Sequence, residues 1–474
     1  MYATPDSSLF TELMEEATGR MSDAYQNIPA HFWVGRNAFS HRFDNLRQMA
    51  TRSAAANPVE AKAPLAVSEE LLSAKRTALY LGVPWCIQSC SFCDLAYSRS
   101  PRAEEKREYI EVILQELDLY NDIGLSKVPA GSLYFGGGTP SILDNELLAS
   151  FVDGTLQRTN LAGNAVITLE GSPATLTDSK LKILSSRVNR ISLGVQSTDT
   201  ELRQREGRIL PRDKLLDRIS ATLDHVELVN TDVLYGMPGQ SPESVYCTLV
   251  DLVRLNVPSI TFYRNELFPG TKSYRLAQQE PWSSIEEFNA RKMYFLGKVY
   301  LESCGYSETP LGWFVKSKQT MAISSWEKMI DSWSSVVPYF GLGMGAFSTA
   351  AAHWIQNSES LKDWMESIRS GRLPLASGTL FNEQERFMVK FMRYIRVFSR
   401  VKREFLLSQS GSNRSAVESL IGFWKKAGLA IDEAEWLVFT QAGESLIHWL
   451  IDDLTQAFVN GVLRSEKNIL AVNI

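Results

Sequence analysis

The chain has 474 residues, of which 44% are hydrophobic and 22% are charged, and its formal net charge is −5. This length allows two or three folding units with a large core, and no dense Lys/Arg run suggests a nucleic-acid or anionic-membrane surface. Five cysteines, three of them clustered, favour a reducing compartment, and no stretch reaches the roughly 18 apolar residues of a membrane span. We therefore expect a cytoplasmic, monomeric enzyme without nucleic-acid or membrane partners.

Residues 1–74 are predicted to form an N-terminal helical extension and linker. Apolar residues at helical spacing predict a helix over Ser8–Tyr25, and the Ala/Pro-rich stretch Ala54–Ala66 is typical of a linker. The aromatic run His31-Phe32-Trp33 could cap a barrel or touch substrate, but packing is the favoured interpretation. The N-terminus has no apolar segment of the kind found in signal peptides.

Residues 75–300 alternate between short apolar runs and amphipathic helices, which predicts a parallel sheet of βα units. The expected strands are Thr77–Val83, Ser132–Phe135, Val166–Glu170, Arg190–Val195, Val226–Leu234 and Ser259–Tyr263. The expected helices are Ala103–Leu119, Thr177–Ser185, Asp199–Arg205 and Pro242–Leu255. Polar and glycine-rich segments follow the strands, where a (β/α) barrel keeps its active site.

The last third of the chain is predicted to contain an irregular, aromatic-rich closing segment and a helical domain. Residues 301–375 contain Trp313, Phe314 and Tyr339, which suit either a flat unsaturated ligand or the core. Residues 376–474 are expected to hold amphipathic helices, a hairpin over Gly428–Phe439 and a closing helix over Thr440–Leu454. This arrangement resembles a winged helix, but its mixed charge favours a lid or support over DNA binding.

Three cysteines dominate the functional prediction. Cys86, Cys90 and Cys93 have a spacing of three and two intervening residues. Three thiolates without a fourth can hold three irons of a [4Fe–4S] cluster and leave one iron open to a small molecule. Buried packing cysteines and half of a zinc site are the alternatives, but no second Cys or Cys/His pair lies nearby. The remaining cysteines, Cys247 and Cys304, are isolated.

Other polar positions follow the predicted strands. The glycines of Gly136-Gly137-Gly138-Thr139-Pro140 could meet the ends of a ligand through bare backbone, or could form an ordinary tight turn. Glu170 ends a strand, where a carboxylate could hold ribose hydroxyls or an amino group. Gln196 and Asp232 end later strands, and the guanidinium of Arg208 could pair with a carboxylate. Taken singly, these last three residues are more often structural.

Eight motifs occur in order along the chain: Tyr80 to Cys93, Gly136-Gly137-Gly138-Thr139-Pro140-Ser141, Glu170-Gly171-Ser172-Pro173, Asn189 to Ser197, Gly207-Arg208, Asp232 to Gln240, Pro269-Gly270-Thr271 and Gly341 to Ser348. Together they resemble the oxygen-independent coproporphyrinogen III oxidase family of radical S-adenosylmethionine (SAM) enzymes. The resemblance covers about residues 76–350. It implies an α/β fold: a partial (β/α) radical SAM barrel with an N-terminal extension and a mostly helical, winged-helix-like C-terminal domain.

The resemblance also implies cofactors and residue roles. It implies a [4Fe–4S] cluster, two SAM molecules and an electron donor such as flavodoxin or ferredoxin. Carried over by motif, the cluster-bound SAM would contact Tyr80, Gly137, Glu170 and Phe347. The second SAM would contact Gly138, Thr139, Gln196, Arg208 and Asp232. Phe92 would pack over the cluster.

The chain departs from the family at several positions. The family histidine before the first cysteine is Gly82, and the further cysteine of the true decarboxylases is replaced by Leu95. The heme motif of the heme-chaperone branch is missing, because no histidine lies between Leu311 and Phe340. These departures favour the branch of SAM-pair methyltransferases and cyclopropanases.

Three functions follow from this sequence. The preferred hypothesis is methyl or methylene transfer from the second SAM to an sp² carbon of a small-molecule substrate. The alternative is tetrapyrrole chemistry of the coproporphyrinogen oxidase type, in heme biosynthesis or degradation. A non-catalytic cofactor carrier is a hypothesis of another class, and the predicted second SAM site argues against it.

Overall fold

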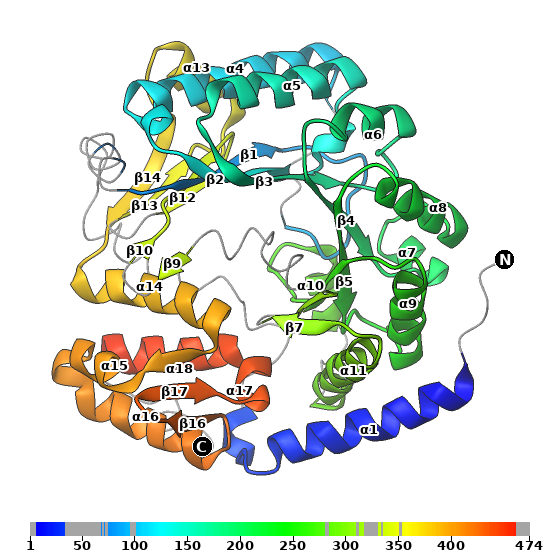
Figure 1. The fold of residues 1–474 in the computed structure, drawn as a ribbon, viewed down its shortest axis with the longest axis vertical. Helices are drawn as coiled ribbons and strands as arrows, with labels where there is room; N and C mark the ends of the chain where they lie inside the picture. Colours follow the sequence, from blue (N-terminus) through cyan, green and yellow to red (C-terminus); the bar gives the residue numbers. More distant parts are fainter. Residues whose placement is uncertain are drawn as a thin grey trace.

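A computed structural model describes residues 6–33, 68, 71, 74–94, 101–279, 284–309, 312–316, 330–332, 335–349 and 353–460. Its central feature is a 12-stranded sheet in the order β14-β13-β12-β11-β1-β2-β3-β4-β5-β6-β8-β7. The sheet curves around a central space, with helices outside and a second, mostly helical unit at one end (Figure 1). The expected class, α/β with a partial barrel and a helical C-terminal region, is confirmed.

Six parallel strands form the barrel wall. They are β1 (Thr77–Val83), β2 (Ala130–Gly137), β3 (Leu161–Gly171), β4 (Arg190–Gln196), β5 (Leu228–Tyr235) and β6 (Ser259–Arg264). The predicted helices are confirmed as α4 (Ala103–Asp122), α6 (Asp178–Leu184), α7 (Thr200–Arg205) and α9 (Pro242–Arg254). Four further helices had no prediction: α5 (Asn145–Arg158), α8 (Arg212–Leu223), α10 (Lys272–Gln279) and α11 (Ser284–Ser303).

Alternation of side chains along these strands separates an apolar outer face from a polar inner face. The outer face is sealed beneath the helices, and Leu81, Phe135 and Leu193 have no exposed surface. A few residues within the strands keep some exposed surface. Two of them, Tyr134 on β2 and Asp232 on β5, lie on the inner face. Closed (β/α) barrels usually fill this space with branched apolar residues. Here the inner face instead carries polar side chains, among them Tyr134 and Asp232.

The segment predicted to be irregular instead extends the sheet, so that part of the prediction is wrong. β11 (Tyr339–Leu342) pairs parallel to β1, and the antiparallel strands β12 (Phe347–Thr349), β13 (His353–Asn357) and β14 (Leu375–Leu380) follow. At the other edge, β8 (Trp313–Val315) pairs antiparallel with β6, and β7 (Ser307–Thr309) pairs with β8. β9 (Ile330–Ser332) and β10 (Ser335–Val336) form a separate two-stranded sheet. The helix α13 (Leu361–Arg369) connects β13 to β14. These strands are too short to show a clear alternating pattern.

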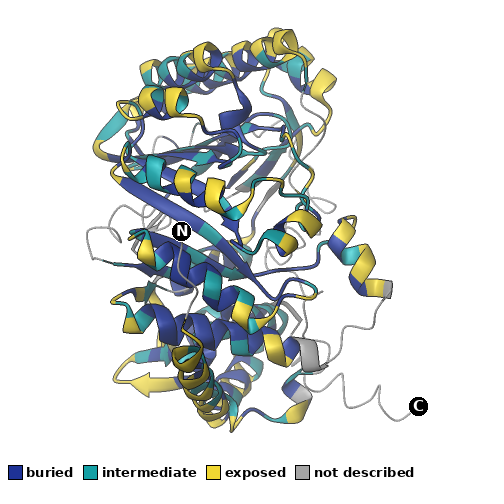
Figure 2. Cartoon of the chain, turned by 90° about the vertical axis from the view of Figure 1, so that its right-hand side faces the viewer, coloured by how far each residue is buried: buried dark blue, intermediate teal, exposed yellow. Residues whose placement is uncertain are grey.

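The C-terminal region has its own apolar core. It contains α14 (Glu383–Phe398), α15 (Arg403–Gln409), α16 (Arg414–Lys426), α17 (Gln441–Ser445) and α18 (Ile447–Asn460). The predicted hairpin is confirmed as β16 (Ala430–Glu433) and β17 (Trp436–Phe439), and β15 (Arg400–Lys402) adds a third strand. The expected single closing helix is two helices. In Figure 2 the helices bury one side and expose the other, as amphipathic sequences predict.

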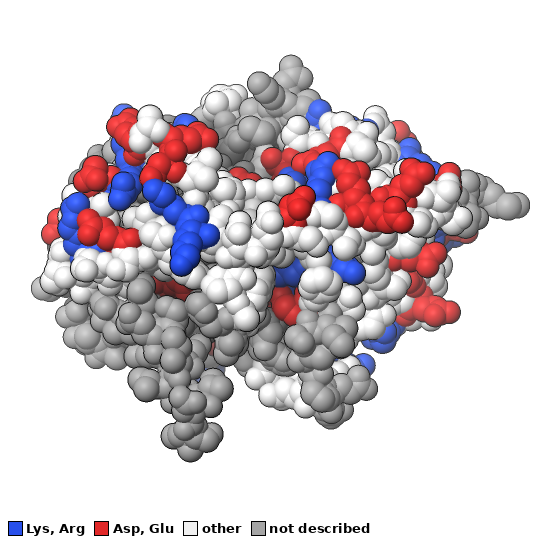
Figure 3. Space-filling model, turned by 90° about the horizontal axis from the view of Figure 1, so that it is seen from below, with Lys and Arg blue, Asp and Glu red and all other residues white. Residues whose placement is uncertain are grey.

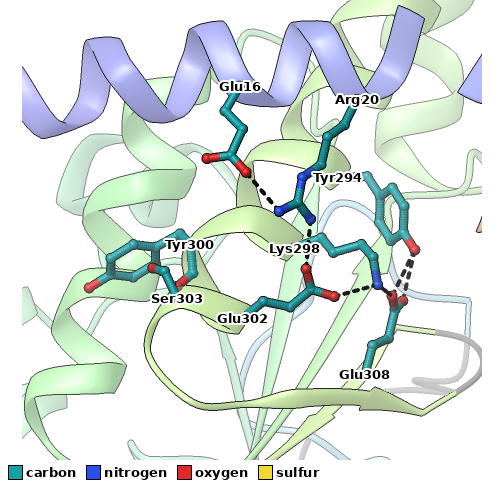
Figure 4. A network of polar contacts seen from close by, with 8 residues as sticks. All are labelled: Glu16, Arg20, Tyr294, Lys298, Tyr300, Glu302, Ser303 and Glu308. Carbon is teal, nitrogen blue, oxygen red and sulfur yellow. Dashed lines mark hydrogen bonds and ion pairs between the residues drawn. The ribbon is translucent and has the colours of Figure 1, made fainter. Parts of the chain in front are cut away.

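The N-terminal helix α1 (Ser7–Tyr25) ties the barrel to the C-terminal region. Its Arg20 bonds Glu16 at 2.7 Å and Glu302 of α11 at 2.8 Å, and Lys298 bonds Glu302 at 2.8 Å (Figure 4). Tyr294 donates to Glu308 at 2.8 Å, which extends this network to β7. The linker predicted over 54–66 lies outside the described residues.

Phe32 and Trp33 of the aromatic run after α1 are packed, as expected. Phe32 is 2% exposed, and its ring lies 6.1 Å from Phe423 and 6.2 Å from Trp449 of the C-terminal region. On the face shown in Figure 3, side chains of both signs occur, and acidic side chains form a run over its right-hand half. Every helix among the described residues is too short or too polar to span a bilayer.

Candidate active site

The three cysteines lie in a loop directly after β1, which we call the cluster loop (residues 84–94). All three are free thiols and half-buried, and the Cys93 amide donates to the Cys90 carbonyl at 3.3 Å. Within the described residues, no three His, Cys, Asp or Glu side chains are grouped as ligands of one metal ion. A cubane cluster needs a wider arrangement, because each thiolate binds a different iron. The donor set of three accessible thiols fits such a cluster.

Neighbouring segments clamp the cluster loop in place. A Cβ on Gly207 would lie 2.7 Å from the Ser89 carbonyl oxygen, and one on Gly138 would lie 2.5 Å from that of Trp85. The Ser91 amide donates to the Glu206 carbonyl at 3.3 Å, and the Ser273 amide donates to the Ser91 carbonyl at 2.9 Å. The loop is therefore held by the segments after β2, β4 and β6, and glycines permit the close approach.

The triple glycine lies between the cluster loop and the barrel interior. Gly137 has a φ of +105°, and a Cβ there would lie 2.8 Å from the Val83 carbonyl oxygen. The Thr139 hydroxyl lies 3.1 Å from Cys86 Sγ. Burial raises the pKa of Cys86, and the Thr139 contact opposes this shift. The backbone at 137–139 is thus adjacent to both the thiols and the inner face.

Glu170 lies at the inner face of β3, with part of its surface open to the barrel interior. Tyr134 donates a hydrogen bond of 2.8 Å to Glu170 Oε1, and the ring of Tyr80 stacks on Tyr134 at 5.7 Å. The other carboxylate oxygen would be 3.0 Å from a Cβ on Gly136, so only glycine fits there. Burial raises the pKa of Glu170 to about 7, although the Tyr134 and Gly137 hydrogen bonds oppose that shift.

Asp232 occupies the same inner face on β5. It accepts hydrogen bonds from Asn230 at 2.9 Å and Ser192 at 3.2 Å. Burial raises its pKa, while the nearby charge of Arg190 lowers it. Arg190 is 3% exposed and lowers the pKa of Glu170 as well. One guanidinium therefore lies between two interior carboxyl groups and offsets their charge.

Gln196 and Arg208 border the interior at the end of β4. Gln196 has a φ of +67°, a left-handed conformation that is unusual for a non-glycine residue, and its Oε1 accepts from Tyr263 at 3.3 Å. Arg208 donates to the Gly194 carbonyl at 2.6 Å, and its guanidinium lies 5.9 Å from the ring centre of Phe92. Phe92 packs against the small apolar cluster that includes Leu202.

Phe347 reaches the site from β12. Its side chain is 47% exposed, and its ring lies 5.6 Å from Tyr339, which in turn lies 6.1 Å from Tyr80. Together with Tyr134, these rings form a row across β2, β1, β11 and β12. Phe314 is sealed in the core and takes no part in this row.

All thirteen residues predicted for the site therefore lie in the cluster loop, on the inner face or beside it. Sequence reasoning missed Tyr134, Arg190 and Tyr263, and it named Tyr339 only as an aromatic that suits either a flat ligand or the core. The three missed residues lie on predicted strands and face inward, so strand alternation was the available signal.

Comparison with known proteins agrees with this geometry. A family model of the radical SAM superfamily matches residues 80–250, which contain the cluster loop and most of the predicted site. The chain carries a radical SAM domain. A [4Fe–4S] cluster and SAM, predicted from the cysteine motif, are the cofactors of that superfamily.

The relatives of this radical SAM chain include proteins of heme metabolism. The chain is 23% identical over 378 residues to the heme chaperone HemW of Buchnera aphidicola, covering 79% of this chain and 97% of that protein. It is 23% identical over 363 residues to the oxygen-independent coproporphyrinogen III oxidase of Paracoccus denitrificans, covering 73% and 78%. Coproporphyrinogen III oxidase (HemN) of Escherichia coli shares the fold, with a TM-score of 0.72, 18% identity and coverage of 84% and 94%. The narrower resemblance to methyltransferases and cyclopropanases gains no support from these relatives.

Proposed function

We propose that this chain is a radical SAM enzyme that acts on a flat, unsaturated substrate of the tetrapyrrole class. The observation that carries the proposal is the position of the cluster loop, which contacts the segments after β2, β4 and β6 beside the inner face that carries Glu170 and Asp232. The similarity to coproporphyrinogen III oxidases and heme chaperones supports tetrapyrrole chemistry over the methyl transfer favoured by the sequence alone.

In this proposal the chain binds and positions the reacting groups. Cys86, Cys90 and Cys93 hold the cluster. When bound, cluster and SAM supply a 5′-deoxyadenosyl radical. Glu170 and the Gly137 backbone hold the amino group and ribose of SAM near the thiols. The curved sheet would shield a reactive species held at its inner face from side reactions with water.

A second SAM would be held by Gln196, Arg208 and Asp232, together with Gly138 and Thr139. The first three residues offer a carboxamide, a guanidinium and a carboxylate. Arg208 can pair with a SAM carboxylate in addition to its bond to Gly194. Binding of two SAM molecules therefore follows from the proposed roles of the predicted residues.

The row of aromatic rings supports a flat substrate. Tyr134, Tyr80, Tyr339 and Phe347 have successive ring-centre distances of 5.7, 6.1 and 5.6 Å. Such a wall offers apolar area and polar hydroxyls to a planar ligand. The exposed ring of Phe347 marks its outer end.

Methyl or methylene transfer is the second candidate, because this chain lacks three features of its relatives. Gly82 replaces the family histidine, Leu95 replaces the decarboxylase cysteine, and the heme motif is missing between Leu311 and Phe340. A SAM-pair reaction would use the same cluster loop and the same inner carboxyl groups. The two candidates differ in where the radical takes its hydrogen.

The test uses anaerobically reconstituted protein, reductant and SAM with a deuterated methyl group. Unlabelled 5′-deoxyadenosine, formed together with oxidation of a supplied porphyrinogen, supports tetrapyrrole chemistry. Deuterium in 5′-deoxyadenosine, together with S-adenosylhomocysteine, would replace that proposal with carbon transfer from the second SAM. If reconstituted protein makes no 5′-deoxyadenosine with dithionite, a cofactor carrier is the better description. A Cys86→Ala variant is the control for cluster-dependent product.

A further inference from the structure

Ser91 is the buried residue of the cluster loop between Cys86 and Asp94. In that stretch every other residue is half-buried or exposed, whereas Ser91 is 6% exposed. Ser91 lies between the second and third cysteines, Cys90 and Cys93. A hydroxyl is costly to bury unless it has hydrogen-bond partners. The partners of Ser91 therefore decide how the turn between these two cysteines is held.

The polar groups of Ser91 all have partners, and these lie on two neighbouring segments. Its amide donates to the Glu206 carbonyl at 3.3 Å, and its hydroxyl donates to a carboxylate oxygen of Glu206. Its carbonyl accepts from the Ser273 amide and its hydroxyl accepts from the Ser273 hydroxyl, both at 2.9 Å. Glu206 follows α7, and Ser273 lies on α10. One residue thus attaches the turn from Cys90 to Cys93 to the segments after β4 and β6.

Glu206 is a fixed acceptor for the Ser91 hydroxyl. It is 5% exposed, and its amide donates to the Leu202 carbonyl at 3.0 Å, at the end of α7. The carboxylate oxygen that does not bond Ser91 lies 3.5 Å from Nε of Arg205. Hydrogen bonds to a carboxylate are stronger than those between neutral groups. The Ser91 contact is therefore the strongest candidate for holding this part of the loop.

Cys86, the first cysteine, is held by other contacts. Its Sγ lies 3.1 Å from the Thr139 hydroxyl, and the preceding Trp85 carbonyl packs against Gly138. These contacts come from the segment after β2, whereas those of Ser91 come from the segments after β4 and β6. Three thiolates that bind different irons of one cluster must be correctly spaced. The spacing of Cys90 and Cys93 from Cys86 therefore depends on the Ser91 contacts.

We propose that Glu206 is a positioning residue for the cluster, which holds Cys90 and Cys93 at the required spacing through the Ser91 hydroxyl. This inference rests on the proposed function, since it assumes that the three cysteines bind the cluster. Glu206 acts through Ser91 and is not an iron ligand. What Glu206 supplies is a hydrogen-bond acceptor in a fixed place. Loss of the carboxyl group and loss of the hydroxyl should therefore have the same effect.

Cluster retention in three variants tests the proposal. Each full-length variant is reconstituted anaerobically, and iron release to a ferrous chelator is followed by absorbance. We expect Ser91→Ala and Glu206→Ala to release iron about tenfold faster than the wild type, because each loses a hydrogen bond to a charged group. Glu206→Gln should stay within about twofold of the wild type, because its carboxamide oxygen still accepts from Ser91.

Two outcomes of this experiment would overturn the proposal. One is a wild-type rate of iron release in both alanine variants, because the contact would then have no effect on the cluster. The other is release from Glu206→Gln as fast as from Glu206→Ala, because the charge of Glu206 would then matter rather than its hydrogen bond to Ser91.

The spectrum of the reduced cluster separates positioning from a general loss of stability. We expect Ser91→Ala and Glu206→Ala to change its electron paramagnetic resonance signal, and Glu206→Gln to keep the wild-type signal. The matched control is Tyr294→Phe, which removes a buried hydroxyl that donates to the Glu308 carboxylate at 2.8 Å. This control should lower the free energy of unfolding without changing iron release or the signal. If it releases iron as fast as Ser91→Ala, lost stability explains the effect and the proposal is wrong.

Hydrogen exchange of the chain without cluster gives a readout that does not depend on iron. The amides of Ser91 and Cys93 are hydrogen-bonded, to the Glu206 and Cys90 carbonyls. We expect residues 89–93 to exchange about tenfold faster in Glu206→Ala than in the wild type, and at the wild-type rate in Glu206→Gln. Unchanged exchange in Glu206→Ala would overturn the proposal. If that variant exchanges faster but the wild type binds no cluster, Glu206 holds the loop and the proposed function is contradicted instead.

Discussion

Glu116 on α4 and Glu170 on β3 are both enclosed by protein, and burial raises the pKa of their carboxyl groups to about 8 and about 7. They differ in what surrounds their oxygens. Glu116 has no exposed surface, whereas Glu170 keeps part of its surface open to the barrel interior. The comparison separates a carboxyl group that holds the fold together from one that is available to a ligand.

Protein donors occupy the carboxyl group of Glu116. It accepts from the Gly343 amide at 2.8 Å, from Asn357 at 2.7 Å and from the Trp364 indole at 3.0 Å. These partners lie after β11, at the end of β13 and on α13. Glu116 therefore fixes the glycine loop that leads to Phe347, and it has a structural role.

The carboxyl group of Glu170 has fewer protein donors. Tyr134 and the Gly137 amide donate to it, and its second oxygen faces Gly136, where a side chain would collide. An enclosed carboxyl group that lacks a full set of donors is costly unless a ligand completes it. The ammonium or ribose hydroxyls of SAM would supply those donors.

The largest effect is expected from Glu116→Ala. The variant leaves three buried N–H donors without an acceptor, each costing about 1–3 kcal/mol, so we expect a loss of about 3–5 kcal/mol in the free energy of unfolding. Urea denaturation would measure it, with exposed Glu111→Ala on the same helix as the control. If Glu116→Ala and Glu111→Ala have equal unfolding free energies, Glu116 does not have the proposed structural role.

Glu170→Gln should have the opposite profile. Loss of the negative charge should slow SAM cleavage about 100-fold, since hydrogen bonds to charged groups contribute up to about 3 kcal/mol. Unfolding free energy should change by less than about 1 kcal/mol, because the protein donors already available to this side chain are few. The assay is 5′-deoxyadenosine formation with dithionite. If Glu170→Gln is strongly destabilised but has normal activity per folded molecule, Glu170 has a structural role like that of Glu116.

The raised pKa of Glu116 gives a pH prediction. Burial raises the pKa of Glu116 in the folded chain to about 8, so the carboxyl group keeps its proton up to about that pH, whereas in the unfolded chain it loses the proton near its ordinary pKa of 4.5. Between these values the folded state binds more protons, so the contribution of Glu116 to stability falls as pH rises. The difference in unfolding free energy between wild type and Glu116→Ala should shrink across this window. A difference that stays constant across this window would show that Glu116 is already ionised in the folded state.

Glu170 could be predicted from sequence because local information identifies it. It ends an apolar strand and begins the motif Glu170-Gly171-Ser172-Pro173, and parallel strands bring such positions to one edge. The same reasoning located the cluster loop and Asp232. Tyr134 was missed because it lies within a strand, and only its contact with Glu170 distinguishes it from a packed tyrosine.

Glu116 could not be predicted from sequence. On α4 it is one of several acidic residues on an amphipathic helix, and its three donors lie 227, 241 and 248 positions later in the chain. The strand that precedes Gly343 and the strand that carries Asn357 were also missed, because β11 and β13 are short and lie among glycines and aromatics. Long-range pairing determined both features, and local propensity carries little information about such pairing.

The smallest expected effect is that of Tyr134→Phe, which tests how much of the Glu170 site depends on one neutral donor. The variant removes a 2.8 Å hydrogen bond and keeps the ring that stacks on Tyr80. Because a neutral hydrogen bond contributes about 1 kcal/mol, we expect SAM to bind about fivefold more weakly, as measured by calorimetry. Tyr306→Phe is the matched control, since Tyr306 donates a bond of 2.6 Å to the Val257 carbonyl away from the site. That control should lose stability without losing affinity. If Tyr134→Phe instead binds SAM with wild-type affinity, SAM binding does not depend on the orientation of Glu170. The assignment of Glu170 as the ligand-binding carboxyl group would then be wrong.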